Sequence, residues 1–133
     1  SDISENVVRN IKLNQKSNNL FFEVIQSDLF DKIPKTTFDV ICINPPYYKR
    51  QVQTEADFAW YCGENLEYFK ALFRSLANYV HSKSLVLMVL SEDCAINEIK
   101  EIALANCFDL KLLKSKKIWL EENYIFEIIP TTS

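Results

Sequence analysis

The fold is decided by the stretch FDVICINPPYY, residues 38–48. Its first part, Val40–Ile43, is apolar and rich in β-branched residues, which is typical of a buried parallel strand. The strand must end at Pro45 and Pro46, because proline has no N–H to donate to a neighbouring strand and its fixed φ stiffens the chain. Open α/β sheets bind ligands at the carboxyl ends of their strands. The sequence therefore predicts a site where this central strand ends.

The residues after this strand suit a planar –NH₂ group. The nitrogen of an amide, or of an amino group on a base, is a poor nucleophile because its lone pair is delocalised. The side-chain oxygen of Asn44 and the carbonyl of Pro45 can accept its two N–H bonds and aim the lone pair at an electrophile. Tyr47 can lay its ring on a flat amide or base. The alternative is a plain turn, with Tyr47 as ordinary packing.

Apolar periodicity predicts the other elements. A helix is expected to begin at Asp2, which has capping-box spacing to Glu5, and to end at Asn18–Asn19, before a strand over Leu20–Gln26. We then expect a loop over Lys49–Thr54 and a helical pattern from Glu55, with an apolar stripe over Leu66–Val80. A strand over Ser84–Leu90 follows, and Ser91–Asp93 supply the caps of a helix with its stripe over Ile96–Ala103. Two closing strands are expected over Phe108–Ile118 and Tyr124–Ile129.

Composition indicates one compact domain over residues 1–133, with 48% hydrophobic and 25% charged residues. No apolar run is long enough to cross a bilayer. The net charge of −3 argues against a surface built to bind phosphates, although it leaves room for a local basic patch at Lys49 and Arg50. These two side chains either meet a phosphate or acidic protein surface or are simply solvated. Trp60 and Tyr61 either wall a substrate pocket or pack in the core.

The four cysteines have neither a close pair nor the spacing of a metal site. They are Cys42, Cys62, Cys94 and Cys107. We expect free thiols in a reducing cytoplasm rather than a disulfide or a zinc site, with Cys42 inside the buried strand. The single His81 is given no catalytic role.

Asn44-Pro45-Pro46-Tyr47, after a strand that Asp39 leads, resembles the substrate motif of class I S-adenosylmethionine-dependent N-methyltransferases. The chain is most similar to their small-domain type, which includes the release-factor glutamine methyltransferases. The resemblance implies that Asn44 and the Pro45 carbonyl hold the acceptor amine, that Pro46 completes the motif, and that Tyr47 packs on the acceptor. It also implies a Rossmann-like α/β sheet, mostly parallel with an antiparallel closing strand pair.

The resemblance places the cofactor, S-adenosylmethionine, at two acidic positions. Asp2, in Asp2-Ile3-Ser4, matches the residue that accepts hydrogen bonds from the ribose hydroxyls, and the alternative for Asp2 is a plain helix cap. Asp28 matches the acidic residue near the adenine amino group, with Leu29 or Phe30 beside the ring. The alternative for Asp28 is a loop cap. Asn44 also borders this site.

Gly63 is the only glycine in the chain, so the glycine-rich turn with which this fold approaches a nucleotide is absent. The resemblance then implies a C-terminal part of a larger methyltransferase, with two strands of the sheet missing between Leu20–Gln26 and Val40–Ile43. Either these two strands pair directly or another copy of the chain fills the gap by self-association.

The sequence therefore predicts transfer of a methyl group to an amide or amine nitrogen. The resemblance and the acidic charge favour a glutamine of a protein such as a release factor over an amino group of RNA or DNA. The alternative of another class is a non-catalytic domain that binds a partner. No membrane association and no metal are expected, and these residues alone are expected to bind the cofactor weakly or not at all.

Overall fold

The computed structural model describes residues 1–131, and the chain divides into two compact units. The first unit is Ser1–Lys35, and the second comprises residues 36–133. None of the helices in the described part of the chain is long and apolar enough to cross a membrane.

In the first unit, helix α1 (Glu5–Ser17) confirms the predicted helix, but its cap differs from the prediction. Ser4 is the N-cap, and its hydroxyl accepts a hydrogen bond from the Val7 amide at 3.5 Å. Asp2 instead forms a backbone bridge with Gln26, and its carboxylate accepts a bond from the Ser4 amide at 2.8 Å. Because this bridge holds Asp2 outside the helix, the capping role moves two residues along the chain.

The strand predicted over Leu20–Gln26 is wrong. The segment has no regular secondary structure, and its only strand-like pairing is the bridge between Gln26 and Asp2. Phe21 is 97% exposed. An apolar run becomes a strand only when a neighbour completes its hydrogen bonds, and these residues have no such ladder. The alternative in which this segment pairs as a strand with Val40–Ile43 is therefore wrong as well.

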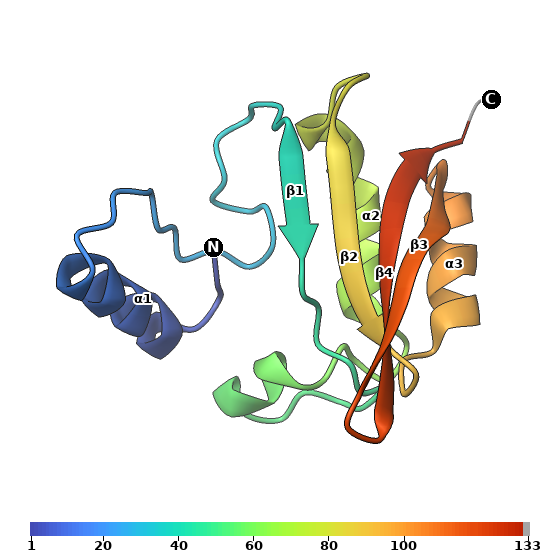
Figure 1. Cartoon of the computed structure of the whole chain (residues 1–133), viewed down its shortest axis with the longest axis horizontal. Coiled ribbons are helices and arrows are strands. Elements are labelled where there is room, and N and C mark those ends of the chain that lie inside the picture. The colour runs from blue at the N-terminus through green and yellow to red at the C-terminus, as the bar shows by residue number, and fades with distance from the viewer. Residues whose placement is uncertain (132–133) are drawn as a thin grey trace. The chain divides into compact units, whose positions relative to one another are not determined.

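The second unit is built on a four-stranded sheet in the order β1-β2-β4-β3 (Figure 1). Its strands are β1 (Val40–Ile43), β2 (Leu85–Ser91), β3 (Phe108–Ile118) and β4 (Glu121–Pro130). β1 is parallel to β2, with Ile43 opposite Met88, whereas β4 is antiparallel to both β2 and β3. The predicted α/β class and its antiparallel closing pair are confirmed.

Strand β1 has the predicted bounds but not the predicted burial. It lies at an edge of the sheet, because β2 is the one strand that pairs with it among the described residues. Val40 is 56% exposed and Cys42 is exposed too, so the expectation of a central, buried strand with an inward Cys42 is wrong for this structure. An apolar sequence specifies a strand that is fit for burial, and the neighbours decide whether it is buried.

Both α-helices of the second unit lie on the same face of the sheet (Figure 1). Helix α2 (Glu67–Leu76) buries Phe69, Leu72, Phe73 and Leu76, which confirms the predicted stripe. Helix α3 (Ile96–Ala105) buries Ile99 and Ala103. The buried side chains Val86, Met88 and Leu90 of β2 complete this core.

The helix predicted from Glu55 starts later than expected. Residues Glu55–Ala59 form only a 3₁₀ turn, η1, and a second one, η2 (Ala77–Tyr79), ends the helical region. The chain reverses at Gly63, where φ is 89°, and at Leu66, where φ is 58°. These left-handed residues interrupt any continuous helix before Glu67. The caps predicted at Ser91–Asp93 are also wrong, because Ser91 ends β2 and the N-cap of α3 is Ala95.

Candidate active site

The segment that leaves β1 stands at the end of the sheet where ligands bind in open α/β folds. Pro45 and Pro46 are buried, whereas Asn44 is exposed and Tyr47 is half-buried. The strand ends at Ile43 because the two prolines supply no N–H for a ladder. Their burial fixes the backbone on either side, so the Asn44 amide is presented to solvent by a stiff and anchored loop.

Asn44 and Tyr47 contact each other directly. The Tyr47 hydroxyl donates a hydrogen bond to the side-chain oxygen of Asn44. This bond holds the amide in one orientation and still leaves its oxygen a second lone pair for another donor. The arrangement is a pre-set acceptor with an aromatic ring beside it, which is what a planar –NH₂ group requires.

The Tyr47 hydroxyl stays protonated over a wide pH range. Burial raises the pKa of Tyr47 above its ordinary value, and Cys94 and then Glu121 raise it further by electrostatic repulsion of the phenolate. The hydroxyl therefore keeps the proton that it donates to Asn44.

The loop after the motif is fixed at several points, although its sequence predicts only a polar loop. The Tyr48 amide donates to the Trp60 carbonyl at 2.8 Å, and the Cys62 amide donates to the Tyr48 carbonyl at 2.9 Å. The rings of Tyr48 and Tyr61 meet edge to face at 6.5 Å. The tie between residues 48 and 60–62 joins two segments that are far apart in sequence, and no local pattern reveals it.

Two cations of this loop have partners within the protein. Lys49 forms an ion pair with Glu98 of α3 at 2.7 Å. The Arg50 guanidinium lies over the Tyr61 ring, 5.8 Å from its centre. They are therefore neither simply solvated nor a free phosphate-binding patch, and they hold the loop against α3 and the 60–62 segment.

Trp60 and Tyr61 were expected either in a pocket wall or in the core. Trp60 is 56% exposed, which excludes the core for its side chain. Tyr61 is half-buried between Tyr48 and Arg50. The core beneath this loop contains Cys62 instead, and burial raises the pKa of its thiol to about 11. A thiol in that state is a structural group and a poor nucleophile.

The candidate cofactor residues of the first unit come together around the bridge between Asp2 and Gln26. The Ser27 amide donates to the Asp2 carbonyl at 2.9 Å, and the side chain of Gln26 donates to the Ile3 carbonyl at 3.1 Å. Asp28, next along the chain, is exposed. The bridge thus places Asp2 and Asp28 on neighbouring segments of backbone, next to the buried Ser27.

Leu29 follows Asp28 in a left-handed conformation, with φ of 44°. The Asp28 carbonyl accepts a bond from the Asp31 amide at 3.0 Å, which closes a tight turn at this point. A non-glycine residue with positive φ is strained, and such strain persists where the surroundings fix the turn. Asp28 is therefore displayed at the start of a defined turn.

A second feature at the same end of the sheet was not predicted. An open pocket of about 660 Å³ lies between the turn after β2 and the tip of the β3–β4 hairpin. Glu92 and Asp93 line it from the turn, and residues 118–121 with Asn123 line it from the hairpin. The available signal was the apolar pair Trp119-Leu120 between two predicted strands, where turns are usually polar.

Residues 1–131 contain no cluster of histidine, cysteine or acidic side chains that could hold a metal ion. Within the same residues all four cysteines are free thiols.

Comparisons with known proteins agree with one another. Residues 1–109 match the family model of the methyltransferase small domain. A release factor glutamine methyltransferase of Rhodopirellula baltica is 44% identical over 55 residues, which cover 41% of this chain and 17% of that protein.

Solved structures show the same fold at low sequence identity. A ribosomal protein L11 methylase from Lactobacillus delbrueckii subsp. bulgaricus has a TM-score of 0.67 and 14% identity, over 98% of this chain and 56% of its own. A methyltransferase from Bacteroides fragilis, solved with S-adenosyl-L-homocysteine, has a TM-score of 0.63 and 16% identity, over 98% and 61%. A methyltransferase from Pyrococcus furiosus has 0.62 and 19%, over 94% and 59%. The chain thus spans less than two thirds of each of these proteins.

Proposed function

The chain belongs to the methyltransferase small domain family. From this membership we propose that it acts in S-adenosylmethionine-dependent methyl transfer to a planar amide or amine nitrogen. The observation that carries the proposal is the exposed Asn44 amide, which the Tyr47 hydroxyl holds at the carboxyl end of β1. Such a site orients its substrate and needs little acid–base chemistry.

The proposed work of the chain is to hold and aim the acceptor. The side-chain oxygen of Asn44 and the carbonyl oxygen of Pro45 accept hydrogen bonds from the two N–H groups of the acceptor –NH₂. The lone pair of the nitrogen then points out of the amide plane toward the methyl donor. The ring of Tyr47 limits the tilt of the acceptor. As the lone pair forms the new N–C bond, the nitrogen becomes positive and loses one proton to solvent. S-adenosylmethionine, when bound, supplies the methyl group and receives the electron pair of the broken S–C bond at sulfur.

Asp2 and Asp28 are the residues that we propose for the cofactor, together with Ile3 and Leu29 beside them. The chemistry of the two side chains fits: a carboxylate accepts hydrogen bonds from ribose hydroxyls or from an adenine amino group. Asp28 is exposed, and Asp2 retains acceptor capacity beyond its bond to Ser4. The single glycine, Gly63, lies before α2 and far in sequence from both. We therefore expect weak or no cofactor binding by these residues alone.

For the acceptor we propose a glutamine side chain of a protein. The partial similarity to a release factor glutamine methyltransferase and the net charge of −3 support a protein over a nucleic acid. We further propose that the protein works in a reducing cytoplasm, which the free thiols support.

The test is methyl transfer from labelled S-adenosylmethionine to a release factor, with tRNA and rRNA as competing acceptors. With S-adenosylmethionine at a concentration high enough to offset weak binding, we expect label in the protein on a glutamine, and loss of that label when Asn44→Ala replaces the wild-type chain. Label that enters only RNA would contradict the proposal that the acceptor is a protein, but it would still support methyl transfer to an amino nitrogen. Calorimetry on the same samples addresses the alternative of a non-catalytic domain, because tight binding of S-adenosylmethionine by the chain would eliminate it.

A further inference from the structure

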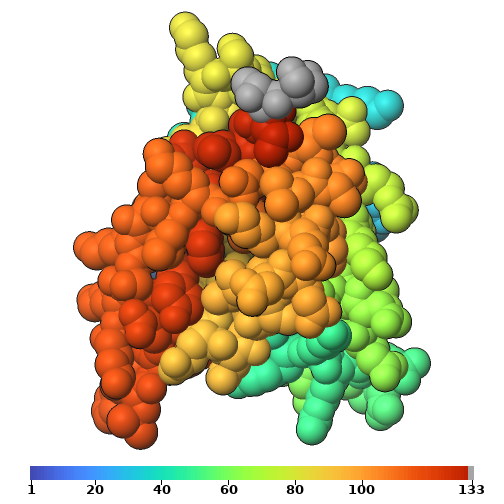
Figure 2. Space-filling model, turned by 90° about the vertical axis from the view of Figure 1, so that its right-hand side faces the viewer, coloured from blue at the N-terminus to red at the C-terminus, as the bar shows by residue number. Residues whose placement is uncertain are grey.

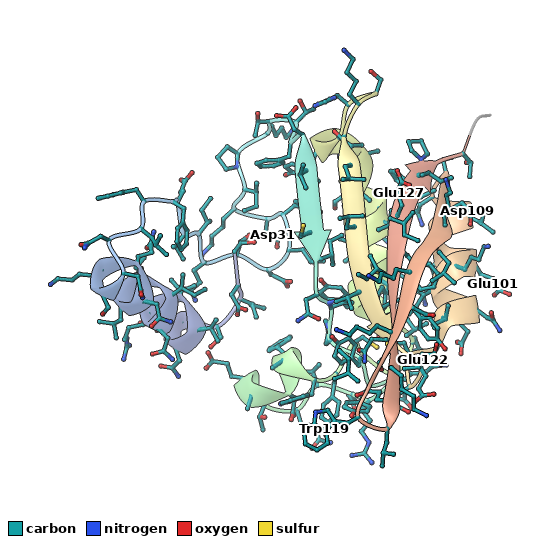
Figure 3. All side chains as sticks on the ribbon, viewed as in Figure 1. Asp31, Glu101, Asp109, Trp119, Glu122 and Glu127 are labelled. Atoms are coloured by element: carbon teal, nitrogen blue, oxygen red, sulfur yellow. The ribbon has the colours of Figure 1, made fainter. Side chains whose placement is uncertain are left out.

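The tip of the β3–β4 hairpin is an exposed apolar surface in an unusual place. Trp119 is 94% exposed and Leu120 is 90% exposed, and Trp119 adopts a left-handed φ of 59°. Figure 2 shows the end of the hairpin at the lower edge of the molecule, and Figure 3 marks Trp119 at this end. A turn between two strands normally carries polar residues, since it faces water. Large exposed apolar side chains next to each other point to an interaction site.

The register of the sheet places this tip at the same end of the sheet as the candidate active site. Ile43 of β1 is opposite Met88 of β2, and three residues further along β2 Ser91 is opposite Asn123 of β4. The tip and the motif after β1 therefore lie at the same end of the sheet (Figure 1). Glu121, the first residue of β4, is close enough to affect the Tyr47 hydroxyl electrostatically.

The hairpin is tied to the turn after β2 close to its tip. The Glu92 amide donates to the Glu122 carbonyl at 2.9 Å, and the Glu122 amide donates back to the Glu92 carboxylate at 3.0 Å. Below the tip, β3 and β4 are paired from Phe108 opposite Pro130 to Ile118 opposite Glu121. The exposed tip is thus carried on an anchored ribbon, which presents its side chains without a large entropic cost.

The charges in the pocket select the kind of partner. Its lining contains three carboxylates, those of Glu92, Asp93 and Glu121, and no lysine or arginine. Lys117 is opposite Glu122, on the face of the hairpin that points away from the pocket. Lys116 is opposite Asn123 and therefore lies on the pocket face, but one residue pair further from the tip than Lys117. A phosphate entering beside Trp119 would meet carboxylates first, whereas a cationic side chain would be attracted.

We propose that the hairpin tip and the pocket beside it dock the polypeptide that carries the methyl-acceptor residue, through an apolar side chain on Trp119 and Leu120 and a lysine or arginine facing Glu121 and Asp93. This inference rests on the proposed function for the identity of the acceptor. It adds a recognition site that is separate from the residues that hold the reacting nitrogen.

The experiment measures binding of the 133-residue chain without cofactor, by fluorescence anisotropy. The probe is a short fluorescein-labelled peptide in which arginine and leucine flank a central glutamine. We expect saturable binding that weakens about tenfold in Trp119→Ser, as for truncation of a central aromatic contact. Leu104→Ser removes a 47% exposed leucine from α3, away from the pocket, and should leave the affinity unchanged. A probe with glutamate in place of arginine should bind more weakly.

Absence of saturable binding to the wild-type chain overturns the proposal, as does equal binding by Trp119→Ser. A single-stranded RNA probe that binds more tightly than the peptide, and does so through Trp119, also overturns it in favour of a nucleic-acid surface. Because binding is read without methyl transfer, an inactive chain still tests docking. Methyl transfer to a protein that is unaffected by Trp119→Ser removes the docking role and leaves the proposed function intact.

Discussion

Two segments lie at the same end of the sheet, and they differ in how far their side chains are engaged by the rest of the protein. The segment after β1 buries Pro45 and Pro46 and ties Tyr47 to Asn44 and Lys49 to Glu98. The tip of the β3–β4 hairpin leaves Trp119 and Leu120 almost fully exposed. The difference agrees with the division of labour that we propose. Chemistry needs groups fixed in advance, which internal contacts provide, whereas docking needs apolar surface that is still free to be covered.

The largest expected effect is on activity, from Asn44→Ala in the anchored segment. Removal of one preorganised hydrogen-bonding group lowers turnover about 100- to 1000-fold in typical enzymes, and we expect the same here for the proposed methyl transfer. Asn44 is exposed, so the melting temperature should stay unchanged. Asn10→Ala, on the exposed face of α1, is the matched control. A variant that keeps full activity would remove Asn44 from the site.

Gly63→Ala should destabilise the segment that anchors this loop. Gly63 has φ of 89°, and a Cβ there would overlap the carboxylate of Glu67. A residue forced into such a conformation costs about 1–3 kcal/mol, measurable by urea unfolding. In the Glu67→Ala background the contact with the carboxylate is gone, and the cost of φ remains together with a close contact of 3.2 Å to the Cβ at position 67. Equal stability of Gly63→Ala and wild type in both backgrounds would contradict this account of the turn.

Tyr47→Phe keeps the ring and removes the bond to Asn44. Loss of one hydrogen bond of about 1 kcal/mol should slow methyl transfer about fivefold, far less than loss of Asn44 itself. A larger loss than in Asn44→Ala would show that the hydroxyl has a role of its own.

The same variant gives a pH test. Because the pKa of Tyr47 is raised in the folded protein, folding favours the neutral hydroxyl. The resulting stabilisation is complete below the unfolded pKa near 10 and is lost as pH rises through the higher folded pKa. Thermal unfolding above about pH 10 should therefore show wild type losing more stability than Tyr47→Phe. Parallel curves would contradict the burial of the hydroxyl.

The smallest effect is expected at the ion pair between Lys49 and Glu98. Both side chains are about half exposed, so the pair should contribute less than about 1 kcal/mol and weaken in salt. A double-mutant cycle with Lys49→Met and Glu98→Gln measures this coupling by denaturant unfolding. A coupling of several kcal/mol would mean that the anchored segment depends on this pair far more than its exposure indicates.

Local signals were enough for several elements. The bounds of β1 follow from an apolar run that stops at two prolines. The apolar stripes of α1 and α2 predict that these helices exist, but not that they begin as late as Glu5 and Glu67. The motif itself, Asn44 to Tyr47, is also visible in the sequence because its residues are consecutive. What is decided by neighbours along the chain can be predicted from the chain.

The rest depended on contacts between distant residues. Leu20–Gln26 has the composition of a strand and forms none, because no ladder completes it, and β1 is exposed because it lies at an edge. The bond from the Tyr48 amide to Trp60 and the pocket between Glu92 and the hairpin join segments that no local pattern connects. The sequence by itself determined where strand, turn and motif occur, and only the tertiary structure decided which of them are paired, anchored or exposed. Hydrogen-bond partners and burial are properties of the assembled chain rather than of any one segment.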